Sequence, residues 1–301
     1  MKSILQSSEW AKFKAAQGFE IFELDGLCVH KRNLPFGKNF LYIPEAGANL
    51  LTPSHIEQIK HLAKKENSIF ARLEILDRFS QNADQMVRAF GFIKAFEQVQ
   101  PKWRQIIDIS KSEEEILAQM KQKGRYNIKV AQKHGVKITT ANENLKAFYD
   151  LYAQTVKREG ITGRTTSYFQ KIVDNFEQTD YLVVFSATYQ NEPVAGAIIT
   201  FYDGVASYLY GGSSRSHRDV MAPYLMHWEI MREAKKRGCS AYDLLGISAP
   251  GKQGKWAGVT KFKEQLGGEA VEILGSYDFV NQSLWYKLFK FAEKIRRKND
   301  N

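Results

Sequence analysis

The pattern of apolar and polar positions in the first quarter of the chain predicts four strands and a helix. The predicted elements are strands at 19–24 and 27–32 joined by Asp25-Gly26, a strand at 40–47, a helix that begins after Pro53, and a strand at 68–76. Asp-Gly is a strong signal for a hairpin turn, and the helix places Ile56, Ile59 and Leu62 on one face. This set of segments is typical of an α/β domain with a mixed sheet.

The second half of the chain repeats this order about 170 residues later. The predicted elements are strands at 180–189 and 193–202, a strand at 206–214, a helix at 222–238 and a strand at 241–248. We therefore predict two related domains, one formed by 1–138 with the returning helix 283–301 and the other by 139–282. Where one helix connects two adjacent strands, the strands can splay and leave a cleft. Two unrelated α/β units are the alternative.

The composition indicates a globular and basic protein. Of the 301 residues, 44% are apolar and 13% aromatic, which is ample for packed cores. Lysine and arginine number 43 against 33 acidic residues, and the net charge of +10 favours an anionic partner such as RNA, a nucleotide or an acidic membrane. Cys28 and Cys239 stand alone, so neither a disulfide framework nor a metal site is predicted. Without a signal peptide or a long apolar run, we expect a cytoplasmic protein.

Cations are concentrated in two segments that contain no acidic residue. In the first, 116–142, four cations recur at every fourth position and predict one basic helical face: Lys121, Arg125, Lys129 and Lys133. In the second, 244–263, the glycines at 251, 254 and 258 predict a flexible loop. The cations of this segment are Lys252, Lys255, Lys261 and Lys263. Both segments are either solvated surface or docking faces for phosphates of RNA.

The last predicted helix is amphipathic. It aligns Leu284, Leu288, Phe291 and Ile295 on one side, with lysines over much of the rest. We expect the apolar stripe to pack on the first domain, and contact with anionic lipid is the alternative.

Several common catalytic signatures are absent from the sequence. No GxGxxG, GxxxxGK[ST], GxSxG or HExxH motif is present. The repeated element order resembles that of acyl-CoA N-acyltransferases (GNAT-like domains), but the glycine-rich turn with which they grip the coenzyme A pyrophosphate is missing. We therefore predict no bound cofactor.

Five strings of the sequence carry a resemblance to a known family. They are SEWAKFK near the start, KREGITGRTTSYFQKI at 157–172, SYLYGGS, APYLMHWEIMREAKKRGCSAYDLLGI at 222–247, and GVTKFKEQLGG at 258–268. In this order they resemble the FemABX family of peptidoglycan bridge-forming aminoacyltransferases. The resemblance covers nearly the whole chain and implies an α/β fold of two tandem GNAT-like domains. No long heptad insertion is present, so the chain is similar to FemX-like members without a coiled-coil arm.

The resemblance also implies which residues form the site. Phe262 and Lys263 match the reacting end, where a fixed ammonium stabilises the oxyanion formed when an amine attacks an aminoacyl ester. The substrate-binding positions fall on Lys14 (with Lys12 as a rival), Arg164, Tyr168, Tyr210 and Glu74. Lys14 and Arg164 would hold a diphosphate across the domain junction, and Arg164 and Lys263 would lie along one groove. The general base stays open between Glu74, Asp243, substrate and water.

The resemblance thus implies a transferase that moves an amino acid from aminoacyl-tRNA to an amine on the stem peptide of a peptidoglycan precursor. The precursor is either UDP-MurNAc-pentapeptide or lipid II, and peripheral contact with the inner membrane surface is an additional expectation. Two alternatives stay open: an N-acyltransferase with an acyl thioester donor, and a basic module that docks on RNA or membrane without catalysis.

Overall fold

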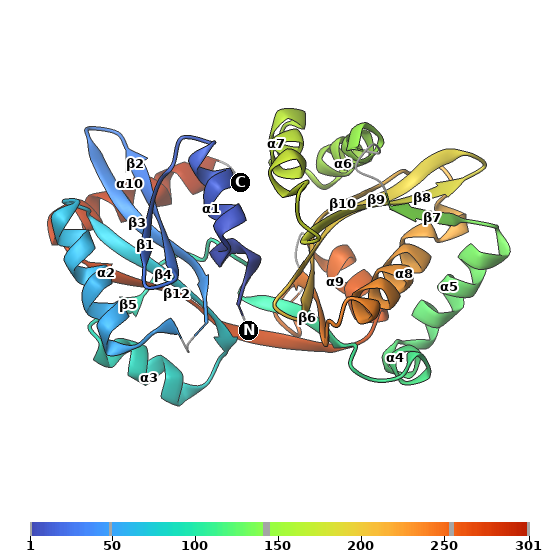
Figure 1. The fold of residues 1–301 in the computed structure, drawn as a ribbon, viewed down its shortest axis with the longest axis horizontal. Coiled ribbons are helices and arrows are strands. Elements are labelled where there is room, and N and C mark those ends of the chain that lie inside the picture. Colours follow the sequence, from blue (N-terminus) through green and yellow to red (C-terminus); the bar gives the residue numbers. More distant parts are fainter. Residues whose placement is uncertain (1, 48–49, 141–144, 253–255, 300–301) are drawn as a thin grey trace. The chain divides into compact units, whose positions relative to one another are not determined.

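The computed structural model describes residues 2–47, 50–140, 145–252 and 256–299, which divide into two compact units (Figure 1). The terminal unit comprises Lys2–Lys102 together with the chain from Glu272 onward, and the central unit comprises Trp103–Val271. Among the described helices, none is both long and apolar enough to cross a bilayer.

The terminal unit is a mixed sheet with helices on both faces. Its elements are η1 (Ile4–Gln6), α1 (Ser8–Ala15), β1 (Glu20–Leu24), β2 (Leu27–Leu34), β3 (Lys38–Ala46), α2 (Pro53–Lys65), β4 (Phe70–Arg78), α3 (Gln81–Ala89), β5 (Ile93–Lys94), most of β12 (Glu269–Val280) and α10 (Ser283–Asn299). The strands run in the order β1-β2-β3-β4-β12, with β3 and β4 parallel and the other pairs antiparallel.

Successive side chains of β4 point to opposite faces of the sheet, and each face has its own apolar core. Ala71, Leu73 and Ile75 join the apolar core beneath α2. The predicted helix face of Ile56, Ile59 and Leu62 belongs to the same core. The intervening residues belong to the opposite face, where Phe70 packs against Tyr286 of α10.

The central unit repeats this layout. Its elements are β6 (Trp103–Asp108), α4 (Glu113–Gln119), α5 (Gln122–Lys133), β7 (Lys137–Thr140), α6 (Leu145–Glu159), α7 (Thr166–Phe176), β8 (Leu182–Tyr189), β9 (Glu192–Tyr202), β10 (Val205–Ser213), η4 (Arg218–Val220), α8 (Ala222–Lys236), β11 (Ala241–Gly246) and α9 (Ala257–Gln265). The strand order is β6-β11-β10-β9-β8-β7, and only β10 and β11 pair in parallel. Helices α6 and α7 cover one face, and α5 and α8 cover the other (Figure 1).

The predicted splay is present between β10 and β11. These strands pair only from Val205–Ser207 to Ala241–Asp243, although β10 continues to Ser213 and β11 to Gly246. The connecting helix α8 begins at this opening. The repeat of hairpin, strand, helix and strand is therefore confirmed in both units, because each parallel pair encloses one helix.

The division between the units differs from the predicted boundaries at 138 and 282. Residues 103–138 pack in the central unit because β6 pairs with β11 and α5 packs on α8. Residues 272–282 belong to the terminal unit because β12 continues along β4.

The predicted glycine loop at 244–263 is wrong over its second half. Residues 257–265 form α9, which packs Phe262 against the core of the central unit and is followed directly by the buried Leu266. Gly258 lies in the first turn of α9, where a glycine destabilises the helix little. The helical spacing of the apolar residues therefore decides the structure of this segment, and its glycine content does not. Lys255 lies outside the described residues.

Candidate functional site

The opening between β10 and β11 contains a cavity of about 960 Å³ in the central unit. Its walls come from the last residues of β10, the start of α8, one side of α9, and α6 near its carboxyl end. A β-carbon at Gly211 would overlap the Tyr208 hydroxyl, so glycine at this position leaves room for the tyrosine ring in the cavity wall. The volume is sufficient for a ligand of several hundred daltons.

Lys263 lies in the wall of this cavity, on the buried side of α9. Its side chain is only 7% exposed, and its ammonium donates a 2.7 Å hydrogen bond to the carbonyl oxygen of Gly246, the last residue of β11. A single carbonyl partner leaves two of the three ammonium hydrogens without a hydrogen-bond acceptor among the described residues. These hydrogens can bond to an oxygen of a molecule that fills the cavity.

A buried ion pair lies beside this ammonium. Arg104 of β6 donates a 2.8 Å hydrogen bond to Asp243 of β11, whose other oxygen accepts from the backbone of Leu245. Burial, aided by the charge of Arg104 and opposed by Asp243, lowers the pKa of Lys263 to about 8. The ammonium is thus mostly protonated at neutral pH and loses its proton slightly above it. Asp243 is occupied by protein donors, which favours a structural role over that of a base.

Aromatic rings complete the inner wall. Phe262 packs edge-on against Tyr224 and His227, and His227 also contacts Tyr208. The Nδ1 atom of His227 lies 2.7 Å from the Tyr242 hydroxyl, whereas its buried Nε2 has no hydrogen-bond partner in the described structure. Burial first, and then the charge of Lys263, lowers the pKa of His227 to about 3, so this imidazole is neutral. Sequence reasoning missed His227, because a single histidine within a helix carries no signal of its own.

The outer rim of the cavity is cationic. Side chains from four elements and loops contribute to it: Lys123, Arg158, Arg215, Arg218 and Lys261. Glu159 and Asp219 offset part of this charge. A positive rim around an aromatic interior suits a ligand with phosphates at one end and an uncharged group at the other. Two of the rim arginines, Arg215 and Arg218, follow the SYLYGGS string and were also missed.

Arg164, Tyr168 and Tyr210 form a second cluster, on the other face of the same sheet. The hydroxyls of Tyr168 and Tyr210 lie 2.9 Å apart, and the exposed Arg164 guanidinium lies 5.0 Å from the Tyr168 ring centre. Tyr210 also contacts Phe169 of α7. Burial raises the pKa of both Tyr168 and Tyr210, so both hydroxyls keep their protons.

A β-bulge in β10 separates the two sites. Tyr208 pairs with Ile199 but Tyr210 pairs with Ile198, so one residue is left over between them. The two tyrosines therefore belong to opposite faces, Tyr208 packing with α8 and Tyr210 with α6 and α7. The structure brings Arg164, Tyr168 and Tyr210 together. It does not place Arg164 on the cavity that contains Lys263.

Lys14 lies in the terminal unit, on α1. Its ammonium is 5.0 to 5.6 Å from the ring centres of Trp10, Phe13 and Phe19, and it donates to Gln17 at 3.2 Å. The guanidinium of Arg32 shares the Phe19 ring at 4.4 Å. Lys14 and Arg32 thus form a basic cluster on one aromatic ring, whereas the rival Lys12 is simply exposed.

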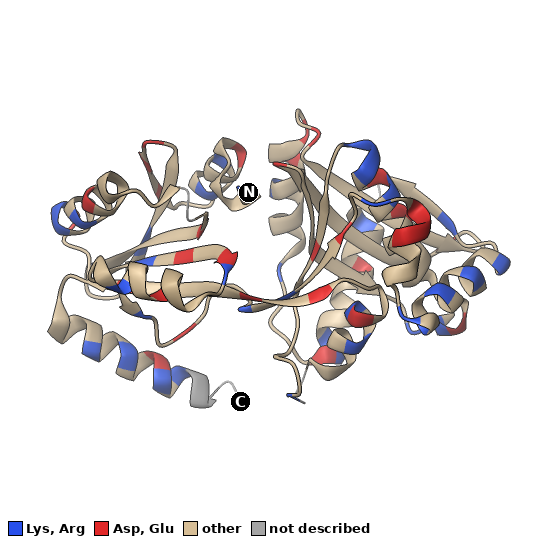
Figure 2. Ribbon diagram, turned by 90° about the horizontal axis from the view of Figure 1, so that it is seen from below, with Lys and Arg blue, Asp and Glu red and all other residues tan. Residues whose placement is uncertain are grey.

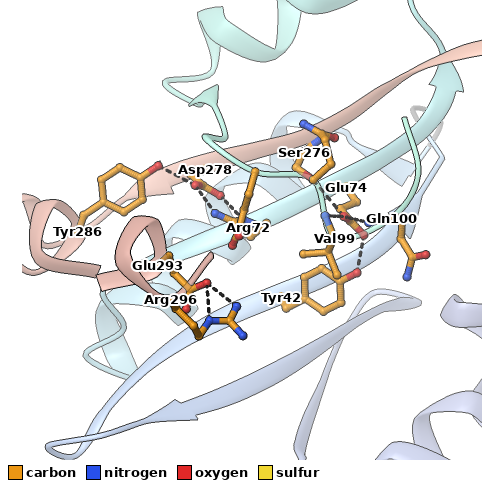
Figure 3. Close-up of polar contacts among 12 residues, drawn as sticks. Tyr42, Arg72, Glu74, Val99, Gln100, Ser276, Asp278, Tyr286, Glu293 and Arg296 are labelled. Atoms are coloured by element: carbon orange, nitrogen blue, oxygen red, sulfur yellow. Dashed lines mark hydrogen bonds and ion pairs between the residues drawn. The ribbon is translucent and has the colours of Figure 1, made fainter. Parts of the chain in front are cut away.

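Glu74 is buried in the terminal unit and bonded by protein donors (Figure 3). One oxygen accepts from the backbone of Val99 and Gln100 and from the Ser276 hydroxyl, and the other accepts from the Tyr42 hydroxyl. Burial, together with nearby Glu45, raises the pKa of Glu74. This arrangement ties β3, β4 and β12 together and gives Glu74 a structural role.

The predicted basic face on α5 is divided. Lys121 pairs with Glu264 at 2.7 Å, and Arg125 donates to the last carbonyls of α4. Lys129 and Lys133 are exposed, as is Tyr126 between them and the start of the helix.

Comparison with known proteins gives one family and several relatives. The model of the FemAB family matches residues 39–190 and 184–294. A lipid II:glycine glycyltransferase of Staphylococcus haemolyticus is 24% identical, over 98% of this chain and 94% of that protein. The protein of the same name from Staphylococcus aureus strain USA300 is 23% identical, over 81% and 78%.

Solved structures show the same architecture. The crystal structure of FemX matches with a TM-score of 0.83 at 20% identity, covering 95% of this chain and 94% of that chain. The C-terminal domain of a putative lysylphosphatidylglycerol synthetase from Agrobacterium fabrum matches at 0.59 with 9% identity, covering 94% and 90%. The likeness to FemX confirms the predicted fold class, two mixed-sheet α/β domains in tandem.

Proposed function

The chain belongs to the FemAB family, as its five strings predicted, and from this premise we propose that it builds peptidoglycan bridges by aminoacyl transfer. The donor is aminoacyl-tRNA, and the acceptor is an amine on the stem peptide of a muramyl-pentapeptide precursor. The observation that carries the proposal is the buried Lys263 ammonium in the wall of a large cavity with a cationic rim. The names of the relatives, glycyltransferases that act on lipid II, support the same class of reaction.

In this proposal, Lys263 acts on the oxygen that becomes negative. The acceptor amine attacks the aminoacyl ester carbon, an amide forms, and the ribose oxygen of the tRNA departs with a proton. An ammonium fixed by the Gly246 carbonyl stabilises the tetrahedral oxyanion or the leaving oxygen without moving. Because the ester is already activated, positioning and charge are enough and no covalent enzyme intermediate is needed. Phe262 and His227 shape the wall beside the ester.

The same cavity accommodates the donor end of the tRNA. Its rim cations face an opening where the terminal phosphates of the RNA can lie, while the aminoacyl group enters the aromatic interior. Arg164, Tyr168 and Tyr210 form a separate polar cluster within the central unit, which we assign to the acceptor. Lys14, within the terminal unit, we likewise assign to substrate binding. A guanidinium stacked on a tyrosine ring offers forked donors to a diphosphate. The protein performs this reaction in the cytoplasm, where both substrates are made.

The proposal is tested by product mass. The full chain is incubated with mixed aminoacyl-tRNAs and, in separate arms, UDP-MurNAc-pentapeptide or lipid II. We expect one acceptor to gain the mass of one or more aminoacyl residues. No gain is expected when the aminoacyl-tRNA is digested with ribonuclease before the reaction. Transfer from acyl-coenzyme A, or a thermal shift with coenzyme A and none with the pentapeptide, supports the thioester alternative instead. Absence of product in every arm contradicts the enzymatic proposal.

We expect the exposed lysines of α5 to contribute to tRNA binding. Changing Lys129→Glu and Lys133→Glu weakens the affinity for tRNA and reduces its dependence on salt, since each lost phosphate contact lowers the slope by about 0.7 to 0.9. The measurement is the dissociation constant at several salt concentrations. The control variant is Lys236→Glu, an exposed lysine of α8 outside the cavity. An unchanged salt slope in the α5 variant means that tRNA binds elsewhere.

A further inference from the structure

Helix α10 has apolar residues on two opposite faces. One face packs on the terminal unit, where Tyr286 is 5% exposed and Phe289 contacts Phe70 and Phe40. The Tyr286 hydroxyl also donates a 2.7 Å hydrogen bond to buried Asp278 (Figure 3). This face anchors the helix to the sheet.

The second apolar face is exposed. Leu284, Leu288, Phe291 and Ile295 are 70%, 50%, 65% and 47% exposed, and their spacing of four, three and four residues forms one stripe over three turns. The predicted packing of this stripe on its own domain is therefore wrong. The reason is that Tyr286 and Phe289, roughly half a turn away, already supply the packing face. Single exposed apolar residues are ordinary, but a continuous stripe marks a contact surface.

A hairpin tip lies close to the start of this helix. Phe36, in the turn between β2 and β3, is 91% exposed and adopts a positive φ of 60°. Such a φ is unfavourable for a large side chain, so the turn holds an aromatic ring in solvent at a conformational cost. Lys38, two residues later, lies with its ammonium 4.4 Å from the ring centre of Trp285 in α10. This contact joins the hairpin to the first turn of the helix.

The charge around the stripe is strongly positive. Segment 283–299 contains six lysines and arginines and a single acidic residue, Glu293. Lys287 and Lys294 are exposed and, at helical spacing, lie along one edge of the stripe. Figure 2 shows lysine and arginine positions along this helix toward the C-terminus. An apolar stripe bordered by lysines is typical of helices that lie in the surface of an anionic bilayer.

We propose that α10 and the Phe36 turn dock the terminal unit on an anionic lipid surface, with the stripe in the acyl boundary and the lysines at the headgroups. Charge distinguishes a lipid surface from a second copy of the chain as the partner of this stripe. Two copies of this chain joined through the stripe would bring two helices of net charge +5 together, which is unfavourable. An anionic bilayer complements both the apolar stripe and its charge. This inference is independent of the proposed reaction, because it uses no residue of the cavity.

Vesicle binding tests the proposal. The full chain is sedimented with vesicles of phosphatidylglycerol and phosphatidylcholine, and with phosphatidylcholine vesicles alone. We expect binding to the mixed vesicles that weakens with salt, and at least about tenfold weaker binding to the neutral ones. Leu288→Ser with Phe291→Ser reduces binding to the mixed vesicles by about tenfold, since two large apolar groups no longer enter the lipid. Lys287→Glu with Lys294→Glu removes the preference for anionic lipid.

The control is Lys64→Glu with Lys65→Glu, two exposed lysines at the end of α2 that change the charge equally but border no exposed stripe. This variant is expected to bind the mixed vesicles within about twofold of the unchanged protein, since screening confines each charge to its own surroundings. An equal loss in this control, or unchanged binding by the serine variant, overturns the proposal. A concentration-dependent dimer that the serine variant abolishes, without vesicle binding, assigns the stripe to a second copy instead. Unchanged thermal unfolding of each variant shows that the fold is intact.

Discussion

Replacing Lys263 with methionine is expected to reduce aminoacyl transfer by about a hundredfold or more while tRNA and precursor still bind. Methionine preserves most of the length and volume of the buried side chain but carries no charge and no donor. Loss of one preorganised donor to an oxyanion typically costs this factor. The measurements are the turnover rate with saturating substrates and the dissociation constants of both substrates.

Two further variants make this prediction specific. Lys236→Met removes an exposed lysine of α8 outside the cavity and is expected to leave transfer unchanged. Lys263→Arg keeps the positive charge but places it on a broader group in a buried wall, so partial activity is expected. If Lys263→Met binds neither substrate, the residue contributes to binding and not to the chemical step. Full activity would show that the cavity is not the reaction site.

The pH dependence distinguishes the ammonium from a free amine. Burial lowers the pKa of Lys263 to about 8, so the residue is charged below this pH and neutral above it. The acceptor amine reacts as the free base, whose fraction rises with pH up to its own pKa of about 10. If the charged form is needed, the falling fraction of charged Lys263 offsets the rising fraction of free acceptor amine above pH 8. The transfer rate then rises with pH up to about pH 8 and is level above it. If Lys263 acted as the base instead, the rate would rise about twice as steeply on a logarithmic scale below pH 8 and would continue to rise above it.

The order of elements could be predicted because local patterns carry it. The Asp25-Gly26 turn, the helix after Pro53 and the matching set in the second half all appear where the periodicity placed them. The division between the units could not be predicted, because it depends on the strand with which β6 pairs. That pairing, Asp108 with Ala241, joins residues far apart in sequence and leaves no local signal.

The family resemblance supplied candidate site residues, but the sequence carried no sign of their geometry. The bulge at Leu209 turns Tyr208 and Tyr210 to opposite faces, and an alternating strand pattern gives no sign of it. Likewise, Lys263 was expected on a mobile loop, and its burial on α9 follows from packing of the neighbouring Phe262 and Leu266. The lowered pKa of Lys263 depends on this burial and could not be inferred from the sequence.

A second large effect is expected from Arg72, which is fully buried in the terminal unit (Figure 3). Its guanidinium donates two 2.8 Å hydrogen bonds to the two oxygens of Asp278 and a third to Glu97. Arg72→Met takes the guanidinium away from Glu97 and from the fully buried Asp278 carboxylate. Breaking a buried ion pair from one side costs about 3–5 kcal/mol, a large part of the stability of an ordinary domain. Denaturant unfolding of the terminal unit measures the loss.

The matched control for this prediction is Arg88→Met. Arg88 forms a 2.7 Å pair with Asp84 on the surface of α3, where water compensates the loss, so a much smaller cost than for Arg72→Met is expected. The cause is separated from lost packing by the triple variant Arg72→Met, Glu97→Gln, Asp278→Asn. This variant removes all three charges and should recover part of the stability, whereas a loss of packing alone would persist. Because Asp278 also accepts from Tyr286, we expect Arg72→Met to loosen α10 as well, linking the buried network to the exposed stripe.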